Sequence, residues 1–168
     1  GGVVTWNYSV AATAVEYLAD GETKTETFTF NIEDGEGGVI PRTVTVTITG
    51  TNDDPVVSAA DVTGGVTEAV TPSGNLTDTG TITFTDVDLT DVHTVSAVTP
   101  SAGALGTLTA SVTTDTTGTG LGGVVTWNYS VAAADVEYLA DGETKTETFT
   151  VNSEGGEGGG MPRTAAGQ

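Results

Sequence analysis

The sequence predicts an all-β fold, an immunoglobulin-like β-sandwich arranged as a tandem repeat. Three observations support this fold class. Thr, Val and Gly dominate the composition. Apolar and polar residues alternate in several short segments, and turn residues separate these segments. No stretch shows sustained helical periodicity, and about seven short strands per repeat are typical of such a sandwich.

The repeat sets the organisation of the chain. Residues 1–43 return as residues 122–164 with an offset of 121, and 36 of the 43 positions are identical. The segment 48–121 has no second copy in the 168 residues. We therefore expect the chain to begin partway through one repeat and to end partway through the next, as a piece of a longer array of similar modules.

This offset predicts three parts: 1–50 as the C-terminal half of one repeat, 51–55 as an inter-domain linker, and 56–168 as the next repeat. The last strand of that repeat is expected to be missing, because "TVTVTITG" (43–50) is matched by "TAAGQ" (164–168). Two arrangements would supply a last strand. Residues 42–50 could be donated to another molecule, or 1–50 could pack against 56–121 as a permuted domain that leaves 122–168 surplus. We expect either arrangement ahead of two independent domains.

The individual strands follow from the alternation. In 3–10, Val4, Trp6, Tyr8 and Val10 share one face. The remaining strands are predicted at 25–32, 43–50, 56–59, 62–67, 80–88, 93–99 and 106–114, and 122–131 repeats the first of them. Residues 14–20 are expected to form one short helical turn.

Charge and composition exclude several function classes. The chain has 23 Asp plus Glu against 4 Lys plus Arg, a net charge of -19. Such a charge argues against nucleic acid and against anionic membranes as partners. No apolar run reaches the roughly 20 residues of a membrane-spanning helix, so no membrane insertion is expected. There is no Cys, which excludes disulfides and thiolate metal sites.

Several segments together resemble a known family. They are "TVTVTITGTNDDPVVS" (43–58), "GTITFTDVDLTDVHTVS" (80–96), "GTLTASV" (106–112), "VTWNYSV" (4–10) and "LADGETKTETFTFNIEDGEGG" (18–38). Their order is similar to that of VCBS-type, bacterial cadherin-like repeats, which form the extender arrays of giant RTX adhesins that anchor biofilms. The resemblance implies an immunoglobulin/cadherin-like Greek-key sandwich, secretion to the bacterial cell surface, and Ca²⁺ at the junctions between domains. The chain departs from the family in reading "TNDDP" for the usual "TNDAP", in having Ala69 after Glu68, and in having Gly155 as the counterpart of Asp34.

The acidic residues point to Ca²⁺ independently of the resemblance. Ca²⁺ takes six to eight oxygen ligands from carboxylates, amides and main-chain carbonyls. Oxygens gather on the linker and just after the strand at 80–85. The candidate metal ligands are Asn52, Asp53, Asp54, Glu68, Asp86, Asp88, Asp91, Asp34 and Glu36. The alternative is that these residues only cap and close turns. We prefer the metal for the dense "NDDP" and "DVDLTD" clusters.

No catalytic arrangement is visible, so we do not expect an enzyme. His93 is expected to be a packed or solvated strand residue, and Trp6 and Trp127 to be core residues. Paired carboxylates could serve a glycosidase, but the sequence gives no sign of a cleft. The sequence thus favours a structural extender module of a secreted adhesin, whose partners are neighbouring copies of the same repeat. The alternatives are a module that binds carbohydrate or protein through its loops, and a subunit of an extracellular fibre joined by strand exchange.

Overall fold

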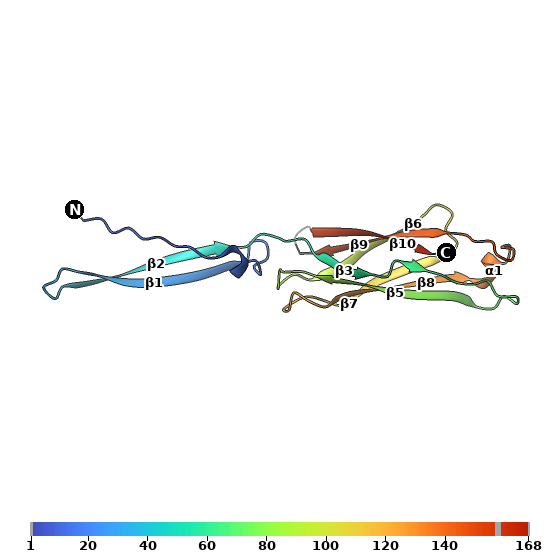
Figure 1. Cartoon of the computed structure of the whole chain (residues 1–168), viewed down its shortest axis with the longest axis horizontal. Coiled ribbons are helices and arrows are strands. Elements are labelled where there is room, and N and C mark those ends of the chain that lie inside the picture. The colour runs from blue at the N-terminus through green and yellow to red at the C-terminus, as the bar shows by residue number, and fades with distance from the viewer. Residues whose placement is uncertain (1, 157–158, 168) are drawn as a thin grey trace.

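The computed structural model describes residues 2–156 and, for the backbone alone, residues 159–167. The chain forms a long two-stranded hairpin followed by a β-sandwich, with the linker between them (Figure 1). The only helical elements of the described residues are one 3-10 turn and one four-residue helix. The predicted all-β class is therefore confirmed.

The hairpin is built from the first copy of the repeat. Residues 2–11 run alongside it without joining a sheet (Figure 1), and a 3-10 turn at Ala12–Ala14 follows. The hairpin strands are β1 (Thr23–Glu33) and β2 (Val39–Thr49). They pair antiparallel from Thr23↔Thr49 to Glu33↔Val39 without a bulge.

The sandwich has two four-stranded sheets. One has the order β3-β5-β8-β7 and the other β4-β10-β9-β6. The elements are β3 (Val56–Ala60), β4 (Thr63–Gly64), β5 (Asn75–Thr85), β6 (His93–Pro100), β7 (Thr107–Thr114), β8 (Gly123–Ala132), α1 (Ala133–Val136), β9 (Glu147–Gly155) and β10 (Gly159–Gly167). If the sandwich strands are lettered A, A′ and B to G in chain order, the sheets read A-B-E-D and A′-G-F-C. This is the Greek-key arrangement of an immunoglobulin-like domain.

Aromatic and branched side chains fill the space between the sheets. Ile82 and Phe84 of β5, Trp127 of β8 and Phe149 of β9 are buried. Two glycines make room for these rings. A Cβ at Gly80 would lie 2.5 Å from Cζ2 of Trp127, and one at Gly123 would lie 2.6 Å from Cζ of Phe84. The core of the sandwich therefore requires small residues under its large rings.

The structure differs from the predicted strands in two places. Residues 3–10 form no strand, although their copy is β8. β8 pairs with β5 on one side and β7 on the other, and the chain holds one copy of those two partners. A strand exists only where a neighbour accepts its main-chain hydrogen bonds. The predicted strand at 62–67 is also shorter, since β4 covers Thr63–Gly64.

The sequence predicted that the sandwich would lack its last strand, and this prediction is wrong, because the backbone of residues 159–167 forms that strand. β10 pairs antiparallel with β9 over Gly159–Gly167, and its end pairs with β4. Ladder hydrogen bonds use main-chain groups, so Ala and Gly can complete the ladder without the Val and Ile of β2.

The permuted arrangement is also contradicted. β1 and β2 form a sheet of their own and pair with no strand of residues 56–121. Within this single chain the sandwich is completed by residues 122–167 instead. Donation of a strand between molecules stays a prediction.

Candidate functional site at the joint

The hairpin and the sandwich meet through hydrogen bonds on both sides of the linker. In the hairpin, the turn at 18–22 folds over Gly50, whose N–H donates to the main-chain oxygen of Glu22 at 2.8 Å. From the sandwich, the N–H of Leu89 donates to the oxygen of Tyr17 at 3.3 Å. The Thr90 hydroxyl donates to the Glu22 carboxylate at 3.4 Å. These contacts connect the end of the hairpin to the loop that follows β5.

The loop after β5, residues 86–91, carries three buried carboxylates. Asp86, Asp88 and Asp91 are 2%, 0% and 7% exposed. The Asp86 carboxylate accepts a hydrogen bond from the N–H of Asp88 at 2.9 Å, which closes a tight turn. The Asp91 main-chain oxygen accepts from the Thr117 hydroxyl at 2.6 Å. The spacing "DVDLTD" therefore places acidic side chains inward at the joint end of the sandwich.

The linker adds its own oxygens to this loop. The N–H of Asp53 donates to Oδ2 of Asp88 at 2.7 Å, and the Asn52 side-chain amide donates to the main-chain oxygen of Asp53 at 3.2 Å. Pro55 is buried directly after them. A Cβ added at Gly156 would lie 2.7 Å from Oδ1 of Asn52 and would overlap the Asp91 carboxylate. Asn52 and Asp91 therefore approach the same point.

Two oxygens at this joint are buried without a donor. Oδ1 of Asn52 and Oδ1 of Asp88 accept no hydrogen bond from the described residues. A buried acceptor without a donor costs roughly 1–3 kcal/mol. Burial raises the pKa of Asp88, and the neighbouring Asp91, Asp86 and Asp53 carboxylates raise it further, against the lowering effect of the Asp53 N–H. The joint thus holds carboxylates whose mutual repulsion a cation would relieve.

The two lysines of the described residues each pair with a glutamate two positions further along the chain. Lys24 Nζ lies 3.8 Å from Glu26, and Lys145 Nζ lies 3.8 Å from Glu147. His93 does contact the cluster. Its Nε2 lies 3.0 Å from Oδ2 of Asp86, and its Nδ1 lies 2.7 Å from Oδ1 of Asp115.

His93 is a packed strand residue, as predicted, and it is buried between these two carboxylates. Asp115 was missed by the sequence analysis. Burial acts to raise its pKa, but the N–H and ring of His93 and the N–H of Thr116 outweigh burial and lower it. The position of Asp115 in the turn-forming stretch "TTDTTG" (113–118) was the one sign in the sequence of a role for it. Nothing in the sequence indicates that it contacts His93.

The structure thus brings five of the nine predicted ligands together: Asn52, Asp53, Asp86, Asp88 and Asp91. Among the described residues, no three His, Asp or Glu side chains converge closely enough to form a metal cage by themselves. A cation here would need the Asn52 amide oxygen and main-chain oxygens as well. That mixture is the one Ca²⁺ uses.

The other four predicted ligands lie elsewhere. Asp54 is exposed on the linker. Asp34 and Glu36 lie in the turn of the hairpin, far from the joint (Figure 1). There Oδ1 of Asp34 accepts the N–H groups of Glu36 and Gly38 at 2.8 and 2.9 Å, which closes the turn and lowers the pKa of Asp34.

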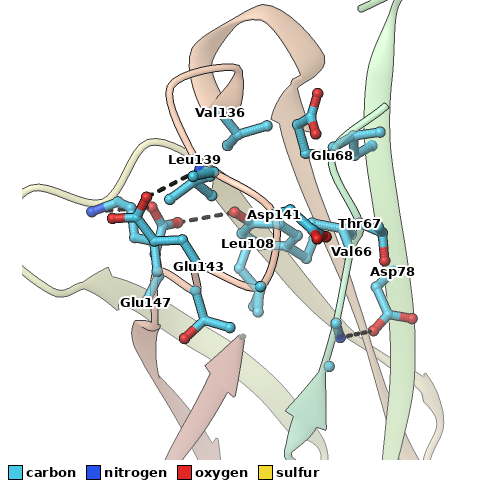
Figure 2. Close-up of a pocket in the computed structure, with 18 of the residues that line it drawn as sticks. Val66, Thr67, Glu68, Asp78, Leu108, Val136, Leu139, Asp141, Glu143 and Glu147 are labelled. Atoms are coloured by element: carbon cyan, nitrogen blue, oxygen red, sulfur yellow. Dashed lines mark hydrogen bonds and ion pairs between the residues drawn. The ribbon is translucent and has the colours of Figure 1, made fainter. Parts of the chain in front are cut away.

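Glu68 lines a cavity together with Val136 of α1 (Figure 2), and α1 lies at the end of the sandwich opposite the joint (Figure 1). Glu68 faces Glu137, whose pKa is raised by burial and by its hydrogen bond and repulsion with Glu68. The segment 61–74 runs along the sandwich away from the joint, so Glu68, in the middle of this segment, does not lie near the linker. The expected part of Glu68 in the junction site is therefore not supported.

A cavity of about 530 Å³ opens at this second end, contrary to the expectation of no cleft. Figure 2 shows the loop at 64–68 on one side and the turn after α1 on the other. Trp127, Tyr129, Leu108 and Leu139 form its apolar lining.

Glu147 is the buried carboxylate of this cavity. It accepts the N–H groups of Leu105 and Gly106 at 2.6 and 3.1 Å and the Tyr129 hydroxyl at 3.0 Å. Burial acts to raise the pKa of Glu147, but these donors and Lys145 outweigh burial and lower it. Glu147 is therefore held as an anion, which does not suit a general acid.

Comparisons with known proteins add little to this geometry. No family model matches the chain, and no curated protein matches it. Among solved structures, the chain is similar to the crystal structure of domains 4 and 5 of the S-layer protein SbsC. The identity is 14%, the match covers 95% of this chain and 80% of that chain, and the TM-score is 0.35. A similarity at this level carries no argument about function. No helix in the described part of the chain has the length and apolar character needed to cross a membrane.

Proposed function

We propose that this chain is a structural extender module of a secreted, cell-surface bacterial adhesin, and that Ca²⁺ rigidifies its joint. The observation that carries the proposal is the convergence of linker and loop oxygens at the joint, where Oδ1 of Asp88 is fully buried and accepts no hydrogen bond from the described residues. The resemblance of the sequence to bacterial cadherin-like repeats supports the extracellular setting.

A cation would act at the joint by bridging two parts of the chain. Asn52 and Asp53 belong to the linker, whereas Asp88 and Asp91 belong to the sandwich. One ion bound to both parts would replace the repulsion among the carboxylates with attraction. It would also give Oδ1 of Asp88 and Oδ1 of Asn52 a positively charged partner. The hinge at 51–55 would then lose freedom, since Pro55 already restricts one backbone angle.

The turn-closing alternative explains part of the cluster. Asp86 and Asp88 both accept main-chain N–H groups, as turn residues do. Turn closure leaves the second oxygen of Asp88 unexplained, because a capping carboxylate at full burial has no reason to leave an oxygen without a donor. A bound cation accounts for the buried Oδ1 of Asp88 and also for the buried Oδ1 of Asn52.

The test is the thermal stability of the chain in Ca²⁺ and in excess chelator. At free Ca²⁺ a hundredfold above its dissociation constant, we expect about 2.7 kcal/mol of added stability. Mg²⁺ should give less, because it requires a near-ideal octahedron. An unfolding midpoint that chelator leaves unchanged would refute the calcium part of the proposal.

A pair of variants localises the effect. Asp88→Asn removes a buried charge but keeps an oxygen for the Asp53 N–H, so in chelator it should be as stable as the parent or more stable by about 1 kcal/mol. It should also lose most of the response to Ca²⁺. Asp54→Asn is the matched control, since Asp54 is an exposed neighbour on the linker. A full Ca²⁺ response in Asp88→Asn would place the ion elsewhere.

A module that binds carbohydrate or protein is the second candidate, and the cavity at the α1 end favours it. The cavity combines an apolar lining with the exposed carboxylate of Glu143 at its rim. A glycan array probed with the chain, and again with Leu139→Asp, tests this candidate. A dose-dependent hit that the variant loses would favour a binding module over a structural extender module.

A further inference from the structure

The first copy of the repeat exposes apolar side chains that the second copy buries. Trp6 is 55% exposed and its counterpart Trp127 is 2% exposed. Phe28 is 47% exposed and its counterpart Phe149 is 2% exposed. Val4 and Val10, whose counterparts Val125 and Val131 are buried, are exposed in the same way. We call Val4, Trp6, Val10 and Phe28 the half-repeat face.

The second copy shows what covers this face. In the sandwich, β8 lies between β5 and β7, and β9 pairs with β6. The Trp127 indole donates to the main-chain oxygen of Asp61 at 2.7 Å. All of these partners come from residues 56–121. The same chain therefore displays both the covered and the uncovered form of one interface.

The polar groups of the half-repeat face are already in position. The Tyr8 hydroxyl donates to Glu26 at 3.0 Å, as the Tyr129 hydroxyl does to Glu147 at 3.0 Å. In the second copy the carboxylate also takes the N–H groups of Leu105 and Gly106. Glu26 is thus arranged to accept two N–H groups from a segment like 56–121.

Residues 56–121 of the same molecule cannot reach this face. If β2 took the place of β10, Thr49 would lie beyond the position of Gly167, at the α1 end. Val56 begins β3 at the joint end, opposite Thr85. The 11 residues of β5 separate the two ends by about 34 Å. The linker 50–55 spans at most about 25 Å. Residues 56–121 of the same molecule therefore do not cover this face, and the same residues of a second copy offer the partners that it lacks.

We propose that residues 2–49 of one chain pack onto residues 56–121 of a second copy and displace residues 122–167 of that copy. The exchange favours apolar burial. Ile32 would stand where buried Ser153 now stands. In the last strand, Val44 and Val46 would stand at the positions of Ala165 and Gly167. Reciprocal exchange gives a closed dimer, and one-way exchange gives an open chain of molecules.

A cross-linking pair tests the register of this contact. Thr109 lies opposite Asn128 in the β7–β8 ladder, and Asn7 is the counterpart of Asn128. The chain has no Cys of its own. In the variant Asn7→Cys with Thr109→Cys, oxidation should yield disulfide-linked dimers and larger species joined through positions 7 and 109.

The control pair is Asn7→Cys with Thr94→Cys. Thr94 lies on β6 in the other sheet, opposite Glu154. Random association would cross-link both pairs equally, and this result would overturn the proposal. A disulfide between positions 7 and 109 within one chain would also overturn it.

Light scattering of the Cys-free chain over a hundredfold range of concentration gives the second readout. The experiment is run in chelator, so that its result does not depend on Ca²⁺ at the joint. The mean mass should at least double across the range. Trp6→Ser with Phe28→Ser should remain at monomer mass, whereas Val70→Ser, at an exposed valine outside the face, should behave like the parent. A parent chain that is monomeric throughout refutes the proposal.

Discussion

Glu147 illustrates how one buried carboxylate is stabilised. Four groups from three separate segments surround it: two main-chain N–H groups, a tyrosine hydroxyl and Lys145 at 3.8 Å. The counterpart Glu26 has the tyrosine and the lysine in the same geometry. The local sequence therefore makes the Tyr–Glu–Lys arrangement, and the rest of the fold adds the two main-chain donors.

At the residue scale we predict a pH dependence that Glu147 causes. Its pKa is lowered in the folded chain, so the carboxylate stabilises the fold above the unfolded pKa of about 4.3, and this stability is lost as pH falls through the lower folded pKa. Glu147→Gln should cost about 1–3 kcal/mol at pH 7 and should flatten the stability curve below about pH 4.3. Denaturant unfolding at several pH values measures both effects. Glu154→Gln, an exposed position on the same strand, should change neither.

At the scale of elements, the repeat places one sequence in two structural environments, so the effect of the environment can be compared directly. The segment at 2–11 and β8 have identical sequences, yet the first pairs with no strand and the second pairs with two. Alternation marks which residues can face a core, but a strand also needs partners for its main-chain groups. The copies also differ in burial, because the core requires both sheets.

We predict that the two copies of one glycine respond differently to alanine. A Cβ at Gly123 would lie 2.6 Å from the buried Phe84 ring, whereas one at its counterpart Gly2 would meet no atom of the described residues within 4 Å. Gly123→Ala should destabilise the sandwich by about 1–3 kcal/mol, because the ring is packed and cannot move freely. Gly2→Ala should leave the free energy of unfolding unchanged. Equal effects of the two variants in urea unfolding would contradict the packing argument.

At the scale of the whole molecule, the hairpin and the sandwich lie end to end (Figure 1), and the joint between them carries the carboxylates of Asp86, Asp88 and Asp91. A chain with net charge -19 repels itself, and this favours extension over compaction. In the described residues, the linker, Tyr17 and Glu22 carry hydrogen bonds across the joint, so its rigidity depends on these contacts, on the backbone of 51–55 and on what neutralises the carboxylates.

We therefore predict that Pro55→Gly broadens the range of hinge angles. Pro55 is buried and fixes one backbone angle next to the cluster. Small-angle scattering in Ca²⁺ should show a wider distance distribution for this variant, while the free energy of unfolding of the sandwich changes by about 1 kcal/mol or less. Pro72→Gly changes an exposed loop proline and is the control. Identical scattering curves for Pro55→Gly and the parent would show that the proline does not limit the hinge.

The sequence by itself determined the all-β class, the repeat, most strand positions and, at the joint, four acidic residues together with Asn52. Periodicity, turn residues and the density of oxygen ligands are local properties of the chain. The alternation around Phe84 and Trp127 therefore predicts their strands, and "DVDLTD" alone predicts candidate ligands. Local pattern also located the joint itself, because Asn52 to Pro55 interrupt a run of alternating residues.

Only the tertiary structure decided which of two copies becomes a core. Trp6 and Trp127 have the same neighbours in sequence, and their burial depends on whether β5 and β7 lie beside them. The structure also separated Glu68 from the joint, paired Asp115 with His93 and opened the cavity at the α1 end. These features depend on contacts between residues far apart in the chain, and such contacts are fixed by sheet topology and not by local pattern.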